Sequence, residues 1–74
     1  MKKILITGGA GYVGSALVPK LLKSGYAINV IDLMIYGETL PEHENLQIFR
    51  SDIRDIQKLK ASLEGVEAVI HLAC

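Results

Sequence analysis

The stretch TGGAGYVG, residues 7–14, decides the fold that this sequence predicts. It follows a short apolar run, residues 4–6, and precedes an amphipathic run from Ser15 to Lys23. This order indicates a strand, a glycine turn and a helix. The first-turn amides of a helix have no partner within it, and the helix dipole is positive at that end. The stretch therefore predicts an anion site between the first strand and the first helix.

Three glycines of this stretch have different physical tasks. Gly8 lets the chain leave the strand in a tight turn, Gly11 lets the backbone approach a diphosphate, and Gly14 lets the helix lie close to the strand. A glycine-rich turn without any ligand fits the bare motif equally well. The context favours a dinucleotide, because a second apolar run, residues 28–31, ends at Asp32, which is 18 residues after Gly14. An acid about 20 residues after the turn is expected to bind the adenosine ribose.

Length and composition set limits on the remaining possibilities. The chain has 74 residues, half of them apolar, which indicates one small globular domain at most. Eight basic and eight acidic residues cancel and are interspersed, so nothing indicates a nucleic-acid partner. Cys74 is the one cysteine, which excludes a disulfide framework within the chain. The apolar run after Met1 is too short for a secretory signal or a membrane span, and we expect a cytoplasmic protein.

The alternation of apolar runs and helical patterns predicts an α/β fold. Strands are expected at Lys3–Thr7, Ala27–Asp32, Leu46–Arg50 and Ala68–Leu72, and helices at Tyr12–Ser24 and Ile56–Leu63, with a loop at Leu33–Asn45. Right-handed crossovers then give a doubly wound parallel sheet of strand order 3-2-1-4. The carboxyl ends of the first and fourth strands flank its topological switch point, where such sheets bind ligands.

Each expected helix has an apolar stripe at helical spacing that predicts its buried face. In the first helix the stripe comprises Val13, Ala16, Leu17 and Leu21, with Val18 as a further candidate, and in the second it comprises Ile56, Leu59 and Leu63. Gly25 and Gly65 follow the two helices directly and are expected to end them in the left-handed conformation.

Four motifs in the chain resemble those of the extended short-chain dehydrogenase/reductases, and more narrowly the NAD-dependent epimerase/dehydratase family that acts on nucleotide-linked sugars. They are residues 7–14, Asp32, SDIRD at residues 51–55, and HLAC at residues 71–74. The resemblance spans the whole chain. It implies that residues 1–74 form the N-terminal part of an NAD(P)-binding Rossmann domain, with the catalytic and substrate-binding parts elsewhere in a longer enzyme that is a homodimer.

The resemblance also implies a role for individual residues. Backbone amides of Tyr12 and Val13 would donate to the diphosphate held in the glycine turn. Asp32 would accept hydrogen bonds from the adenosine ribose. The adenine would contact Asp52 and Ile53, and the ribose and nicotinamide side would contact Leu72 and Ala73. The fourth motif of the family commonly ends in two alanines, and this chain has Cys74 at its last position.

The residues around the ribose site predict the choice of cofactor. The Asp32 carboxylate would repel a 2′-phosphate. NADP-preferring members of the family usually have an arginine in the glycine turn or just after the second strand, where this chain has Tyr12 and Leu33. We therefore expect NAD in preference to NADP.

The catalytic machinery of the family is absent from these residues. Its Tyr-x-x-x-Lys pair would need a lysine four places after Tyr12, Tyr26 or Tyr36, and those places are Ala16, Val30 and Leu40. The chain as given thus predicts cofactor binding without a catalytic residue. A non-catalytic redox sensor or regulator of the same fold, or a structural module without a ligand, would have the same residues. A Tyr-x-x-x-Lys pair beyond Cys74 would favour the enzyme.

Several polar residues have a structural interpretation beside the functional one. His71 ends an apolar strand, where a packed histidine bonded to backbone is expected more often than a ligand. His43 lies in an acidic loop and is expected to be solvated. We expect Asp55 to be a helix N-cap, whereas Asp52 fits a cap and an adenine contact equally. Arg50 and Arg54 are expected to be surface charges, with a place near the diphosphate as the alternative.

Overall fold

The sheet has the predicted topology. The computed structural model describes residues 2–8, 12–32, 43–52 and 54–72. Its elements in order are β1 Lys3–Thr7, α1 Tyr12–Lys23, β2 Ala27–Asp32, β3 Leu46–Arg50, α2 Ile56–Leu63 and β4 Ala68–His71. The strands pair in parallel in the order β3-β2-β1-β4, which confirms the predicted α/β class and strand order.

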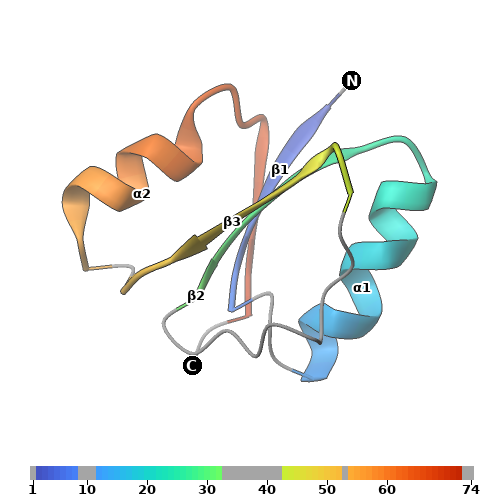
Figure 1. Ribbon diagram of the computed structural model, residues 1–74, viewed down its shortest axis with the longest axis horizontal. Coiled ribbons are helices and arrows are strands. Elements are labelled where there is room, and N and C mark those ends of the chain that lie inside the picture. The colour runs from blue at the N-terminus through green and yellow to red at the C-terminus, as the bar shows by residue number, and fades with distance from the viewer. Residues whose placement is uncertain (1, 9–11, 33–42, 53, 73–74) are drawn as a thin grey trace.

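The two helices lie on opposite faces of the sheet (Figure 1). The connection through α1 moves from β1 to β2, whereas the connection through α2 moves back from β3 to β4. Right-handed crossovers in opposite directions place their helices on opposite faces. This arrangement makes β1 and β4 the neighbours at which the strand order reverses.

The α1 face contains a compact apolar cluster. Ile4 and Ile6 of β1, with Ile28 and Val30 of β2, pack against α1, and the helix contributes Val18 and Leu22. The predicted stripe was wrong in two respects, because Leu22 was not part of it and Ala16 is exposed. The buried line runs through Gly14, Val18 and Leu22 at intervals of four residues, and the Val13 side chain lies outside the described parts.

The residues that α2 buries against the sheet differ from the predicted stripe. Ile56 and Leu63 are 60% and 40% exposed, and the fully buried residue of the helix is Ser62. The amide nitrogen of Asn29, in the middle of β2, donates to the carbonyl of Ser62 at 2.8 Å. A helix held to the sheet through this bond turns Ser62 inward, so the most apolar stripe of α2 does not decide which side faces the sheet.

The helix ends follow the sequence closely. Asp55 is the N-cap of α2, as predicted, and accepts a hydrogen bond from the amide of Lys58 at 3.2 Å. Gly25 and Gly65, with φ values of 93° and 75°, end the helices in the left-handed region. Residues 33–42 of the expected loop lie outside the described residues. Within the described part, neither helix is long and apolar enough to cross a bilayer.

Candidate functional site

The carboxyl edge of the sheet brings the predicted motifs together. Backbone hydrogen bonds continue past the ends of the strands there. The Gly8 N–H donates to the carbonyl of Ile31 at 2.9 Å, and the Leu72 N–H donates to the carbonyl of Thr7 at 2.8 Å. A third runs from Ser51 N–H to Asp32 at 3.2 Å. The glycine turn, the end of β2 and the segments after β3 and β4 therefore leave the sheet side by side.

The front of α1 has the features that an anion site requires. Gly8 has a φ of 75°, a conformation that a residue with a Cβ rarely adopts, and Gly14 is buried where the helix meets the sheet. The first turn of α1 contains no acidic residue, and its last turn contains Lys20 and Lys23. The first helical amides thus have the positive end of the dipole with no carboxylate from the helix's own first turn to compete for it.

Asp32 ends β2 at the same edge and is partly buried. It lies opposite Arg50 in the parallel register with β3. An ionised carboxylate accepts hydrogen bonds only, so it suits paired ribose hydroxyls and opposes a phosphate. Asp32, which the spacing predicts as the acid that binds the ribose, thus ends the strand next to β1, from which the glycine turn starts.

Asp52 follows β3 and has a defined partner. Its Oδ1 accepts from the backbone N–H of Arg54 at 2.9 Å, and its Oδ2 accepts from the guanidinium Nε and Nη2 of Arg54 at 2.9 and 2.6 Å. These bonds hold the pKa of the Asp52 carboxyl below its ordinary value. Asp52 thus stabilises the turn before α2, whereas the N-cap of the helix is Asp55. The Arg54 side chain is 86% exposed, which confirms the prediction that Arg54 is a surface charge.

A side-chain bond between neighbouring strands was missed by the sequence reasoning. The hydroxyl of Thr7 and Nδ1 of His71 lie 2.5 Å apart, at paired positions of β1 and β4. The expectation of a packed His71 bonded to backbone was wrong, because the residue is exposed and its partner is a hydroxyl. Only the pairing register, in which Thr7 and His71 are opposite, would have revealed it. His43 is exposed, in agreement with the prediction.

The structure thus places Gly8, Asp32, Asp52 and Leu72 at one edge, with the backbone of Tyr12 and Val13 at the start of α1. The other predicted cofactor contacts lie outside the described residues: Gly11, Leu33, Ile53 and Ala73. Within the described ranges no group of three or more His, Cys, Asp or Glu residues could hold a metal ion. This edge has the donors and acceptors for binding a dinucleotide.

Comparison with known proteins gives consistent matches. Residues 4–74 match the family model described as the NAD dependent epimerase/dehydratase family. The chain is 35% identical over 71 residues to a 3β-hydroxysteroid dehydrogenase/Δ5→4-isomerase of Mycobacterium tuberculosis, covering 96% of this chain and 19% of that protein. It is equally similar, at 35% over 71 residues, to a UDP-glucose 4-epimerase of Corynebacterium glutamicum, covering 96% of the chain and 22% of the relative.

Solved structures agree with these relatives. The epimerase Mth375 of Methanothermobacter thermautotrophicus superposes with a TM-score of 0.92 at 39% identity, covering 99% of this chain and 23% of that one. The Bordetella bronchiseptica enzyme WbmH, solved in complex with NAD+, superposes with a TM-score of 0.89 at 32% identity, with coverages of 100% and 26%. The chain spans about a fifth of the length of the curated relatives that it matches.

Proposed function

The chain belongs to the NAD-dependent epimerase/dehydratase family, and we propose that it is the NAD-binding segment of an enzyme that modifies a nucleotide-linked sugar. The reaction would be an epimerisation, dehydration or reduction by hydride transfer between nicotinamide and a sugar carbon. The observation that carries the proposal is the shared edge, at which the glycine turn and Asp32 leave adjacent strands. The enzyme would act as a homodimer.

The diphosphate would bind at the front of α1. The turn at Gly8 and Gly11 would give the phosphates room, and the backbone amides of Tyr12 and Val13 would donate to them. Gly14, buried against the sheet, keeps that end of the helix close to the turn. Hydrogen bonds from backbone amides and the helix dipole both favour the charged phosphates over water in this position.

The two nucleosides would extend to either side of this turn. Asp32 would accept hydrogen bonds from the adenosine ribose, with Leu33 beside it, while Asp52 and Ile53 would contact the adenine. The Asp52 carboxylate has lone pairs left for an amino group after its bonds to Arg54. Leu72 and Ala73 would line the nicotinamide side. Bound there, the cofactor would supply a hydride acceptor or donor, and this segment would fix its position.

A titration of NAD and NADP against the native protein tests the assignment. We expect NAD to bind more tightly, and Asp32→Ala to weaken NAD by about ten- to hundredfold, because charge-assisted hydrogen bonds to the ribose are lost. The same change should narrow the gap between NAD and NADP. Asp55→Ala, which removes an acid used as a helix cap, is the matched control and should leave both affinities unchanged. Equal affinity of the unmodified protein for NADP would contradict the role of Asp32.

A turnover assay separates the enzyme from a non-catalytic sensor. The relatives act on different substrate classes according to their names, a UDP-sugar in one and a steroid in the other. We expect the native protein to convert UDP-glucose or a related nucleotide sugar in the presence of NAD, and to leave 3β-hydroxysteroids unchanged. Tight NAD binding without turnover of any nucleotide sugar would favour the sensor, and turnover of a steroid would replace the substrate class.

A further inference from the structure

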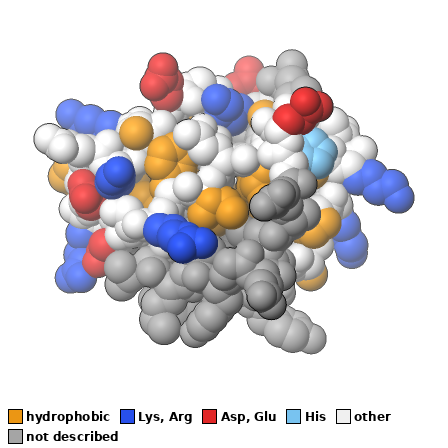
Figure 2. Space-filling model, viewed as in Figure 1, with side chains coloured by type: hydrophobic (Ala, Val, Ile, Leu, Met, Phe, Trp, Pro, Cys, Tyr) orange, Lys and Arg blue, Asp and Glu red, His pale blue; other side chains and the backbone are white. Residues whose placement is uncertain are grey.

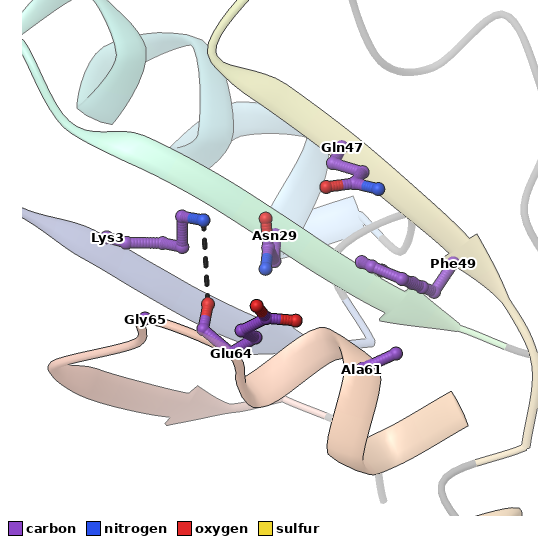
Figure 3. A pocket seen from close by; sticks show the side chains of 7 residues that line it. All are labelled: Lys3, Asn29, Gln47, Phe49, Ala61, Glu64 and Gly65. Carbon is purple, nitrogen blue, oxygen red and sulfur yellow. Dashed lines mark hydrogen bonds between the residues drawn. The ribbon is translucent and has the colours of Figure 1, made fainter. Parts of the chain in front are cut away.

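A cavity lies between α2 and the edge strand β3, lined from Lys3 at the start of β1 to Phe49 near the end of β3 (Figure 3). Its volume of about 450 Å³ is within the range of sites for small molecules. A smaller hollow of about 200 Å³ shares Lys3, Asn29 and Gln47 with it. Lys3 begins β1, about 13 Å along the strand from Thr7. Nothing in the proposed function uses this cavity.

Two opposite charges line the cavity. The Lys3 ammonium donates one long hydrogen bond, 3.5 Å, to the backbone carbonyl of Glu64, and the Glu64 carboxylate is directed toward the cavity in Figure 3. Among the described residues, Arg54 and Asp52 form the one ion pair with a nitrogen–oxygen distance below 4.0 Å. The Lys3 ammonium and the Glu64 carboxylate therefore do not form a direct ion pair. Both groups have unused hydrogen-bonding capacity facing one space.

The position of Lys3 is set by its surroundings. Its side chain passes over Gly65, where a Cβ would lie 3.6 Å from Nζ and 3.9 Å from Cδ and Cε. The left-handed φ of 75° at Gly65 ends α2 and also leaves an open surface for this lysine. The ammonium is therefore held near the end of α2 without being neutralised by a carboxylate.

The other walls are two amides and one aromatic ring. Asn29 commits its amide nitrogen to Ser62, and in Figure 3 its oxygen points away from α2. Gln47 lies opposite Asn29 in the register of β2 and β3, and its side chain is exposed. Phe49, partly buried, supplies an apolar surface. The cavity thus combines a cation, an anion, neutral polar groups and a ring.

We propose that this cavity binds a small zwitterion of the α-amino-acid class, with its carboxylate on Lys3, its ammonium on Glu64 and its side chain against Phe49. A simple anion would satisfy Lys3 but would face the Glu64 carboxylate, and a simple cation would face the Lys3 ammonium. A ligand that has both charges removes both conflicts and forms charge-assisted hydrogen bonds at each end. The proposal does not depend on the proposed function, because Lys3 and Glu64, which would hold the two charges of the ligand, lie at the opposite end of β1 from Gly8. Phe49, which pairs with Ile31, is the lining residue nearest to the carboxyl edge.

Titration of the native protein with L-phenylalanine tests the proposal. Binding is monitored by the NMR signals of the backbone amides of Gln47 and Glu64. We expect saturable binding that is unchanged by saturating NAD. N-acetyl-L-phenylalanine, which lacks the ammonium, and L-phenylalanine amide, which lacks the carboxylate, should each bind about tenfold more weakly or worse. The variants Glu64→Gln and Lys3→Met should lose affinity for L-phenylalanine to a similar extent.

Two neighbouring residues provide matched controls. Glu67→Gln and Lys2→Met change the same residue types at the same end of the molecule, outside the cavity, and should leave the affinity for L-phenylalanine unchanged. The proposal is overturned if L-phenylalanine does not saturate, if either single-charge probe binds equally well, or if the controls weaken binding as much as Glu64→Gln. NAD affinity, measured in the same samples, reports separately on the proposed function.

Discussion

Helix α1 meets the sheet through an aliphatic cluster of Ile4, Ile6, Val18, Leu22, Ile28 and Val30. On the opposite face the buried strand residues are Leu5, Asn29 and Ile31, and Asn29 donates a hydrogen bond to Ser62 of α2. On the α2 side, Ile56, Leu63 and Val69 remain 60%, 40% and 54% exposed. Figure 2 shows hydrophobic side chains exposed among charged ones on the side of the molecule that faces the viewer. Apolar burial stabilises both faces of the sheet, and on the α2 face a directional hydrogen bond also orients the helix.

The largest expected effect is on the free energy of unfolding, and it compares a buried with an exposed isoleucine. Ile28→Ala removes a fully buried side chain from the α1 face and should lower the free energy of unfolding by about 2–5 kcal/mol. Ile56→Ala makes the same chemical change on α2, where the side chain is 60% exposed, and should change it by about 0.5 kcal/mol or less. Denaturant unfolding of the two variants measures both values. Similar losses would contradict the difference in burial between Ile28 and Ile56.

An intermediate effect is expected at the polar contact. Asn29→Ala leaves the buried carbonyl of Ser62 without its donor and should cost about 1–3 kcal/mol. Gln47→Ala, at the paired position of β3 with an exposed side chain, is the matched control. Hydrogen exchange should accelerate in α2 of the Asn29 variant more than in α1. Equal acceleration in both helices would mean that the two faces unfold as one unit.

The smallest effect concerns the turn that leads into α2. Hydrogen bonds from Arg54 hold the pKa of Asp52 below 3.8, so the folded state binds this proton less readily than the unfolded chain. The resulting stabilisation is present above about pH 4 and is lost as the pH falls through the folded-state pKa. Carboxyl NMR titration should show this depressed pKa, and Arg54→Gln or 1 M salt should move it back toward 3.8. A titration curve of Asp52 unchanged by Arg54→Gln would show that Arg54 does not lower the pKa of this carboxyl.

The sequence patterns predicted the elements and their order because those depend on local periodicity and on general rules for parallel sheets. They did not predict which side of α2 faces the sheet. Asn29 was included in an apolar run, and its partner Ser62 lies 33 residues further along the chain. The edge that gathers Gly8 and Asp32 followed from the topology, whereas side-chain partners across strands depend on a register that spacing alone does not reveal.

The backbone bonds that extend past the strands at Gly8, Ser51 and Leu72 have an evolutionary consequence. The segments after β1, β3 and β4 each start from a residue whose backbone amide is hydrogen-bonded to the neighbouring strand, so insertions or replacements further along these loops need not disturb the sheet. Lineages can therefore diversify what the loops recognise while inheriting an unchanged platform.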